Sequence, residues 1–167
     1  SISEFIQNRW YILAAIVLAV ILSYKMYCKT ESGRRKTDAI KLKLPIFGTI
    51  AKKTACARFS RTLATLLKSG MPLMDALDIV ANTMENVVFK EALLKAKNGV
   101  ALGFDLSGQL KATKIFPAMV IHMVSIGEET GNMEEMLNNV ANYYDEEVET
   151  STGQITALME PVIIVIM

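Results

Sequence analysis

The 167 residues are 51% apolar but only 7% aromatic, which favours helices over sheets and leaves room for one domain plus membrane segments. A net charge of +1 hides an asymmetry, because residues 1–114 carry +10 and residues 115–167 carry −9 with no basic side chain. The acidic part is either a solvated helix face or a surface offered to a partner. Two cysteines, Cys28 and Cys56, are too few for a disulfide framework, and we expect both to be reduced apolar side chains.

The first predicted element is a membrane helix. No charged side chain lies between Trp10 and Tyr24, and a cluster of Lys and Arg follows. About 20 apolar residues cross a bilayer, and basic residues gather on its cytoplasmic side. The sequence therefore predicts an extracytoplasmic segment over 1–8, a transmembrane helix over 9–28 and a basic juxtamembrane linker over 29–45, beside anionic lipid.

Apolar residues then recur at three- and four-residue spacing, with no strand-like alternation, and this predicts an antiparallel six-helix bundle over residues 46–152. The expected helices run from about Ile50 to Gly70, from Pro72, from Asn86, over Asp105–Lys111, from Pro117 to Gly131, and from Asn132. Glu135 completes a capping box with Asn132. Gly99 and Gly103 are expected to bracket a turn, and Gly153 to bend or interrupt the last helix.

Residues 153–167 are predicted to start a second transmembrane helix that is cut off, so the chain is expected to be a fragment. Only six residues follow Pro161, too few to span hydrocarbon. Pro161 is expected to kink this helix. Glu160 lies either in the headgroup region or against another helix.

Residues for enzyme chemistry are sparse, so no catalytic, cofactor or metal site is predicted. His122 is the only histidine and has no second ligand in view, and no glycine-rich phosphate loop occurs. Apart from Tyr27 at the membrane, the basic run from Lys25 to Lys43 lacks stacking aromatic residues, so we expect it to contact lipid and not nucleic acid.

Several segments in order carry a family resemblance. They are Leu44–Gly48, the stretch Arg58–Gly70, Phe116-Pro117, the stretch Gly127–Gly131 (sequence GEETG), Tyr143–Val148 and Glu160-Pro161. Over roughly Lys43–Met167 the chain resembles the inner-membrane platform proteins of type IV pili and type II secretion systems, the PilC/GspF family. The tyrosine-rich and Glu-Pro segments favour the pilus branch. The family's first cytoplasmic domain and a further upstream membrane helix are not present in this sequence.

The resemblance implies a multi-pass protein of a bacterial or archaeal inner membrane, with residues 29–152 in the cytoplasm and no chemistry of its own. Its expected partners are a hexameric assembly or retraction ATPase, pilin or pseudopilin subunits, other inner-membrane assembly proteins and further copies of itself. The motif positions that become candidates for partner contact are Arg58, Phe59, Gly70, Pro117, Gly127, Glu128, Glu129, Thr130, Gly131, Glu160 and Pro161.

Glu128 and Glu129 leave three alternatives open. The GEETG segment can be a structural turn, since Gly131 adopts a positive φ cheaply. The two carboxylates can also form a docking surface or hold a cation such as calcium. At the level of the whole chain, the competing functions are a membrane-anchored signalling or regulatory bundle and a cation-dependent sensor.

Overall fold

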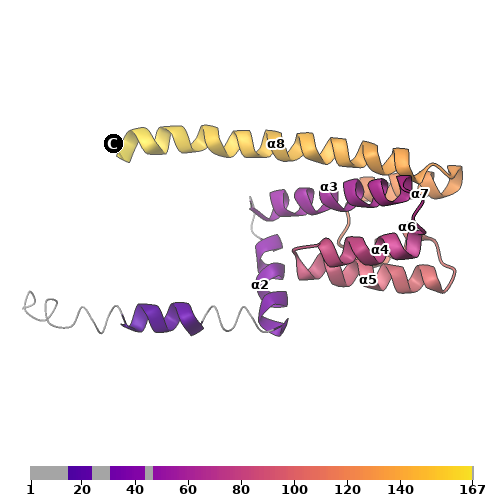
Figure 1. The fold of residues 1–167 in the computed structure, drawn as a ribbon. Helices are drawn as coiled ribbons and strands as arrows, with labels where there is room; N and C mark the ends of the chain where they lie inside the picture. Colours follow the sequence, from indigo (N-terminus) through magenta and orange to yellow (C-terminus); the bar gives the residue numbers. More distant parts are fainter. Residues whose placement is uncertain (1–14, 24–30, 44–46, 167) are drawn as a thin grey trace, which may run out of the picture. The chain divides into compact units, whose positions relative to one another are not determined.

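The computed structural model describes residues 15–23, 31–43 and 47–166, and all regular structure in these ranges is helical (Figure 1). The all-α prediction is confirmed for this part of the chain. Residues 15–23 form a helix on which six large aliphatic side chains are more than half exposed. The rest of the predicted transmembrane helix 9–28, like segment 1–8, lies outside the described residues. In the ranges described, no helix combines the length and the apolarity that crossing a membrane requires.

The chain divides into two compact units, Ser1–Ala39 and Ile40–Met167. A helix, α2 (Glu31–Lys43), occupies most of the predicted juxtamembrane linker, a segment for which the sequence analysis predicted no secondary structure. The second unit, called the helical unit below, contains the six further helices. They are α3 (Phe47–Lys68), α4 (Leu73–Thr83), α5 (Val87–Ala101), α6 (Leu106–Thr113), α7 (Ala118–Thr130) and α8 (Met133–Ile166).

The six helices from α3 to α8 pack as a closed ring. Each helix contacts its neighbour in sequence, and α8 returns to pack along α3 in the most extensive contact of the unit. The ion pairs between α3 and α8 show that these two helices are antiparallel, because later residues of α3 pair with earlier residues of α8. Five of the six contacts are local in sequence, so the α8–α3 contact is the one that joins the two ends of the ring.

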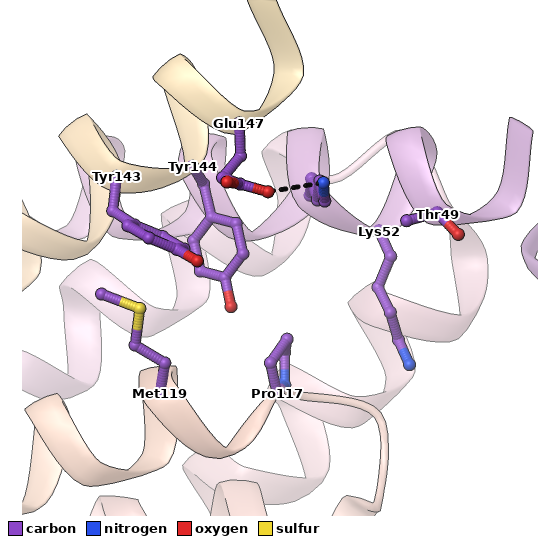
Figure 2. Close-up of a pocket in the computed structure, with 8 residues that line it drawn as sticks. Thr49, Lys52, Pro117, Met119, Tyr143, Tyr144 and Glu147 are labelled. Carbon is purple, nitrogen blue, oxygen red and sulfur yellow. Dashed lines mark hydrogen bonds and ion pairs between the residues drawn. The ribbon is translucent and has the colours of Figure 1, made fainter. Parts of the chain in front are cut away.

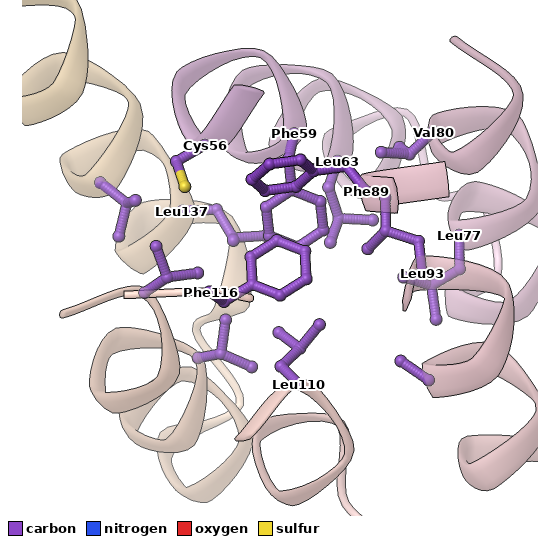
Figure 3. Close-up of a cluster of buried hydrophobic side chains, with 14 of the residues drawn as sticks. Cys56, Phe59, Leu63, Leu77, Val80, Phe89, Leu93, Leu110, Phe116 and Leu137 are labelled. Atoms are coloured by element: carbon purple, nitrogen blue, oxygen red, sulfur yellow. The ribbon is translucent and has the colours of Figure 1, made fainter. Parts of the chain in front are cut away.

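Three phenylalanines from different parts of the ring meet in the core (Figure 3). Phe116 lies 5.2 Å from Phe59 of α3 and 5.4 Å from Phe89 of α5, measured between ring centroids, with the second pair edge to face. Phe59 and Phe89 are fully buried. Burying a side chain of this size contributes roughly 1.5–3 kcal/mol, so this cluster is a main source of the unit's stability.

Most predicted helix ends are confirmed. Gly70 and Gly131 have φ angles of 82° and 71°, as left-handed caps require. The Asn86 side chain accepts a hydrogen bond of 2.9 Å from the Val88 amide and caps α5. Pro72 and Pro117 are N-caps, so α4 and α7 begin one residue later than predicted.

The expected role of Gly99 was wrong. Gly99 lies inside α5, which continues to Ala101, and the turn is formed at Gly103 with a φ of 91°. A Cβ atom on Gly99 would collide with the side chain of Gln109 on α6. In this arrangement the glycine leaves room for the Gln109 side chain between α5 and α6, a contact that no local sequence signal reveals.

The last helix, α8, continues without interruption from Met133 to Ile166. It passes Gly153, which was expected to bend or break it, and it does not end at Pro161. At a rise of about 1.5 Å per residue, such a helix is roughly 50 Å long. Its first half is fixed to the core through the buried residues Leu137, Val140, Ala141 and Tyr144.

Two small polar side chains of α3 lie in the core. Burial raises the pKa of the Cys56 thiol to about 12, so this cysteine is protonated and unreactive. The Ser60 hydroxyl is fully buried and has no hydrogen-bond partner within the described residues. An unpaired buried hydroxyl is a destabilising feature, in contrast to Ser107, whose hydroxyl donates to Asp105 at 3.0 Å.

These two buried serines predict opposite responses to the same substitution. Ser60→Ala removes an unpaired polar group and should stabilise the full chain by about 1 kcal/mol, whereas Ser107→Ala breaks a hydrogen bond and should cost about 1 kcal/mol. Urea unfolding followed by circular dichroism measures both changes. A loss of stability in Ser60→Ala would show that its hydroxyl has a partner in solution.

Candidate functional site

The GEETG segment at the end of α7 holds the neighbouring helix α6 in place. The two carboxylate oxygens of Glu128 accept hydrogen bonds from the backbone amides of Leu106 at 2.5 Å and Ser107 at 3.0 Å. The amide of Gly108 donates to the Asp105 carboxylate at 2.6 Å. All three free amides of the first turn of α6 are thus satisfied, two of them by a residue more than 20 positions away.

This capping matters because α6 has only eight residues. Isolated helices of this length are marginal, so α6 depends on its caps and on packing. The hydrogen bonds from Gly108 and Ser107 hold the pKa of the Asp105 carboxyl below its usual range. Carboxylates at a helix start also interact favourably with the helix dipole.

Glycines on either side of Glu128 let α7 and α8 approach and turn. A Cβ atom on Gly127 would lie 2.9 Å from the Met133 Cα, closer than side chains tolerate, so only glycine fits between these two helices without a shift. Gly131 closes α7 with its positive φ. The side-chain amide of Asn132 donates to Glu135 at the start of α8, which pairs the two residues of the predicted capping box through their side chains.

The other two residues of the segment face the surface. Glu129 is exposed and accepts a 3.3 Å hydrogen bond from Ser125, while the Thr130 hydroxyl donates to the Ile126 carbonyl at 2.7 Å. Of the two adjacent carboxylates, Glu128 is therefore engaged inside the protein, and only Glu129 is exposed as a docking surface requires. Across the described residues, no group of three or more His, Cys, Asp or Glu side chains is arranged to hold a metal ion.

The basic and acidic halves of the sequence meet along α3 and α8. Lys53 lies 2.6 Å from Glu147, Arg61 lies 2.7 Å from Asp145, and Lys68 of α3 lies 3.4 Å from Glu134. Arg61 also donates to Asn142 at 2.9 Å. Three of the nine acidic residues of 115–167 thus pair with basic residues of α3, a partial explanation of the charge asymmetry that the sequence analysis did not consider.

Two exposed acidic side chains of α8 have no partner among the described residues. Glu146 and Glu149 are exposed, and neither has a hydrogen bond or ion pair with another described residue. These two residues are called the acidic pair below. Glu135 is exposed too, but it accepts a hydrogen bond from the Asn132 side chain, so the acidic pair is the part of the predicted acidic face without a partner in the described structure.

The remaining motif positions of α3 and α7 have separate roles. Arg58 forms an exposed 2.5 Å ion pair with Glu85 and holds the pKa of that carboxyl below its usual range. Phe59 is in the core, Gly70 forms a turn, and Pro117 is the N-cap of α7. Glu160 and Pro161 lie within α8. Their side chains are outside the described part of the structure, so the expected contact of Glu160 with headgroups or with another helix stays a prediction.

A hollow that the sequence analysis missed lies between α3, the start of α7 and α8 (Figure 2). Burial, together with the neighbouring Cys56, Tyr143 and Glu147, raises the pKa of Tyr144 to about 12. The ring of Tyr144 packs edge to face on Tyr143, with centroids 5.2 Å apart. The hollow is lined by Thr49, Lys52, Lys53, Pro117, Met119, Tyr143, Tyr144 and Glu147.

Comparison with known proteins identifies the family. The family model described as type II secretion system (T2SS), protein F matches residues 59–167, which include α3 from Phe59 and all later helices. The chain belongs to this family.

Relatives come from both branches of the family. The chain is 42% identical to the type IV pilus assembly protein PilC of Pseudomonas aeruginosa, over 100% of this chain and 45% of the relative. It is 39% identical to the PilC of Myxococcus xanthus, over 98% of this chain and 39% of that protein. It is 30% identical to the type II secretion system protein F of P. aeruginosa, over 95% of this chain and 39% of the relative. The chain thus spans about two fifths of the length of these relatives.

The capping geometry predicts that the two adjacent glutamates differ in their effect on stability. Glu128→Ala leaves two amides of α6 without acceptors and should cost about 2 kcal/mol, whereas Glu129→Ala on the exposed side should change stability by less than about 0.5 kcal/mol. Urea unfolding of the full chain measures both. Equal losses, or a larger loss in Glu129→Ala, would contradict the assignment of Glu128 as the cap of α6.

Proposed function

We propose that this chain is part of a non-enzymatic inner-membrane platform protein that couples a cytoplasmic hexameric ATPase to the assembly or disassembly of pilin subunits. The family membership supports a role in a type IV pilus or type II secretion machine. Identity is higher to the relatives named for type IV pilus assembly, at 42% and 39%, than to the one named for type II secretion, at 30%, which favours the pilus system.

The observation that carries this proposal is the continuity of α8. One end of the helix is fixed in the core, and the same helix extends past Gly153 into the predicted membrane segment over 153–167. An α-helix transmits a displacement along its axis because its backbone hydrogen bonds connect successive turns. A movement imposed on the helical unit by a partner would therefore reach the segment beyond Gly153 without an intervening flexible joint.

The acidic pair is the proposed contact with that partner. Glu146 and Glu149 are exposed on α8, on the same helix that carries the displacement. Charged groups at the rim of an interface mainly set the association rate and its salt dependence. A competing function, a membrane-anchored regulatory module, would share the fold but would require neither a rigid α8 nor ATPase binding.

The first test changes the rigidity of α8 at one position in the full-length protein. Gly153→Pro removes a helix hydrogen bond and should introduce a kink that costs about 3 kcal/mol locally, so we expect at least a tenfold loss of surface pili in cells that depend on this protein. Gly153→Ala is the matched control. No atom lies within 4 Å of a Cβ built there, so alanine should strengthen the helix and preserve pilus number.

Pili are counted by electron microscopy, and the amount of each variant in the membrane is measured by immunoblot. Equal pilus numbers for Gly153→Pro and Gly153→Ala at equal protein amounts would show that α8 continuity is not needed, and would favour the regulatory module.

The second test reverses the acidic pair. Glu146→Lys combined with Glu149→Lys should leave the fold intact, since neither side chain has a partner within the described structure, and should reduce co-purification of the ATPase from native membranes at least fivefold. Lys95→Glu, on the exposed side of α5, is the control for a charge change elsewhere. Unchanged ATPase recovery with the reversed pair would favour a solvated face.

A further inference from the structure

The hollow between α3, the start of α7 and α8 has a volume of about 280 Å³. A single water needs only about 10–15 Å³ of such space, so a group of several heavy atoms fits. Its walls combine aromatic rings and Met119 with polar groups from three helices (Figure 2). All these residues belong to the helical unit.

The first polar contribution is the uncapped start of α7. Pro117 occupies the N-cap position and makes no side-chain hydrogen bond to the helix. The Pro117 carbonyl accepts from Ile121, but the amides of Ala118, Met119 and Val120 have no acceptor among the described residues. A helix start with free amides carries a partial positive charge and attracts anions.

The second contribution is the hydroxyl of Tyr144. This side chain is only 6% exposed, and its hydroxyl points into the hollow between Met119 and Pro117 (Figure 2). It makes no hydrogen bond with any other described residue, and it is accessible from the hollow, because the only buried side-chain polar atom without a partner in the described part of the chain is the Ser60 hydroxyl. A donor is thus held in place without an acceptor.

The third contribution is the ammonium group of Lys52. Its exposed side chain extends from α3 along the side of the hollow opposite Tyr144, and it forms no ion pair within the described residues (Figure 2). Glu147 is the one acidic side chain of the lining, and Lys53 neutralises it at 2.6 Å. The lining therefore keeps one uncompensated positive charge beside the positive end of a helix.

We propose that this hollow binds a phosphate-type oxyanion, held by the Lys52 ammonium, the Tyr144 hydroxyl and the free amides of α7. A tetrahedral oxyanion offers several acceptor oxygens, which suits a hollow to which three helices each contribute a donor. The apolar walls would accommodate carbon attached to the phosphate. The same chemistry is offered by free phosphate and by a phospholipid headgroup, and the site does not depend on the platform function proposed above.

The test measures thermal unfolding of the full chain in detergent with two probes. Inorganic phosphate and soluble dihexanoyl phosphatidic acid are titrated, with sodium chloride of equal ionic strength and dihexanoyl phosphatidylcholine as controls. We expect the phosphate probes to raise Tm beyond the chloride control. Lys52→Gln and Tyr144→Phe should each remove most of this rise, while Lys95→Gln, at an exposed lysine outside the hollow, should keep it.

The two probes also identify the source of the anion. Half-saturation by phosphatidic acid at a concentration at least tenfold lower than inorganic phosphate assigns the site to a lipid headgroup, and similar concentrations assign it to soluble phosphate. The proposal is overturned if neither probe raises Tm beyond its control, or if Lys52→Gln and Tyr144→Phe respond like the unmodified chain.

Discussion

The packing of α8 against α3 is the contact on which the rest of the helical unit depends. It closes a ring whose other contacts join neighbours in sequence. The cluster of Phe59, Phe89 and Phe116 lies in the core of this ring. Burial supplies the stability, because exposed ion pairs contribute only about 0–1 kcal/mol each. The ion pairs from Lys53 to Lys68 contribute alignment, since each requires the antiparallel register that is observed.

The GEETG segment shows how a motif can be structural at one residue and exposed at the next. Glu128 completes the first turn of α6, Gly127 allows α7 to approach α8, and Gly131 reverses the chain. A change at these positions would disturb the ring before it disturbed any partner. Loss of function after mutation of this motif therefore needs a stability measurement before it is assigned to docking.

Three features meet along α8: the acidic pair, the hollow at Tyr144 and the continuous extension past Gly153. Glu147 lines the hollow, and Ile155 lies in the predicted membrane segment over 153–167. The two residues are eight positions apart, which corresponds to roughly 12 Å along a helix. A ligand in the hollow would contact both α8 and the start of α7, so its binding would stabilise the attachment of α8 to the unit. The proposed oxyanion site and the proposed force transmission thus involve the same helix without depending on one another.

The amino-acid sequence by itself determined the helical class, the family, and the ends of helices at Gly70, Asn86 and Gly131, because apolar spacing and capping are local properties of the chain. Only the tertiary structure decided that Glu128 caps α6 and that the Gln109 side chain lies against Gly99. The tertiary structure also decided that basic residues of α3 pair with acidic residues of α8, and that Lys52 and Tyr144 line one hollow. Each of these contacts joins side chains that are distant in sequence. Their meeting depends on how helices pack around a shared core, which local patterns do not encode.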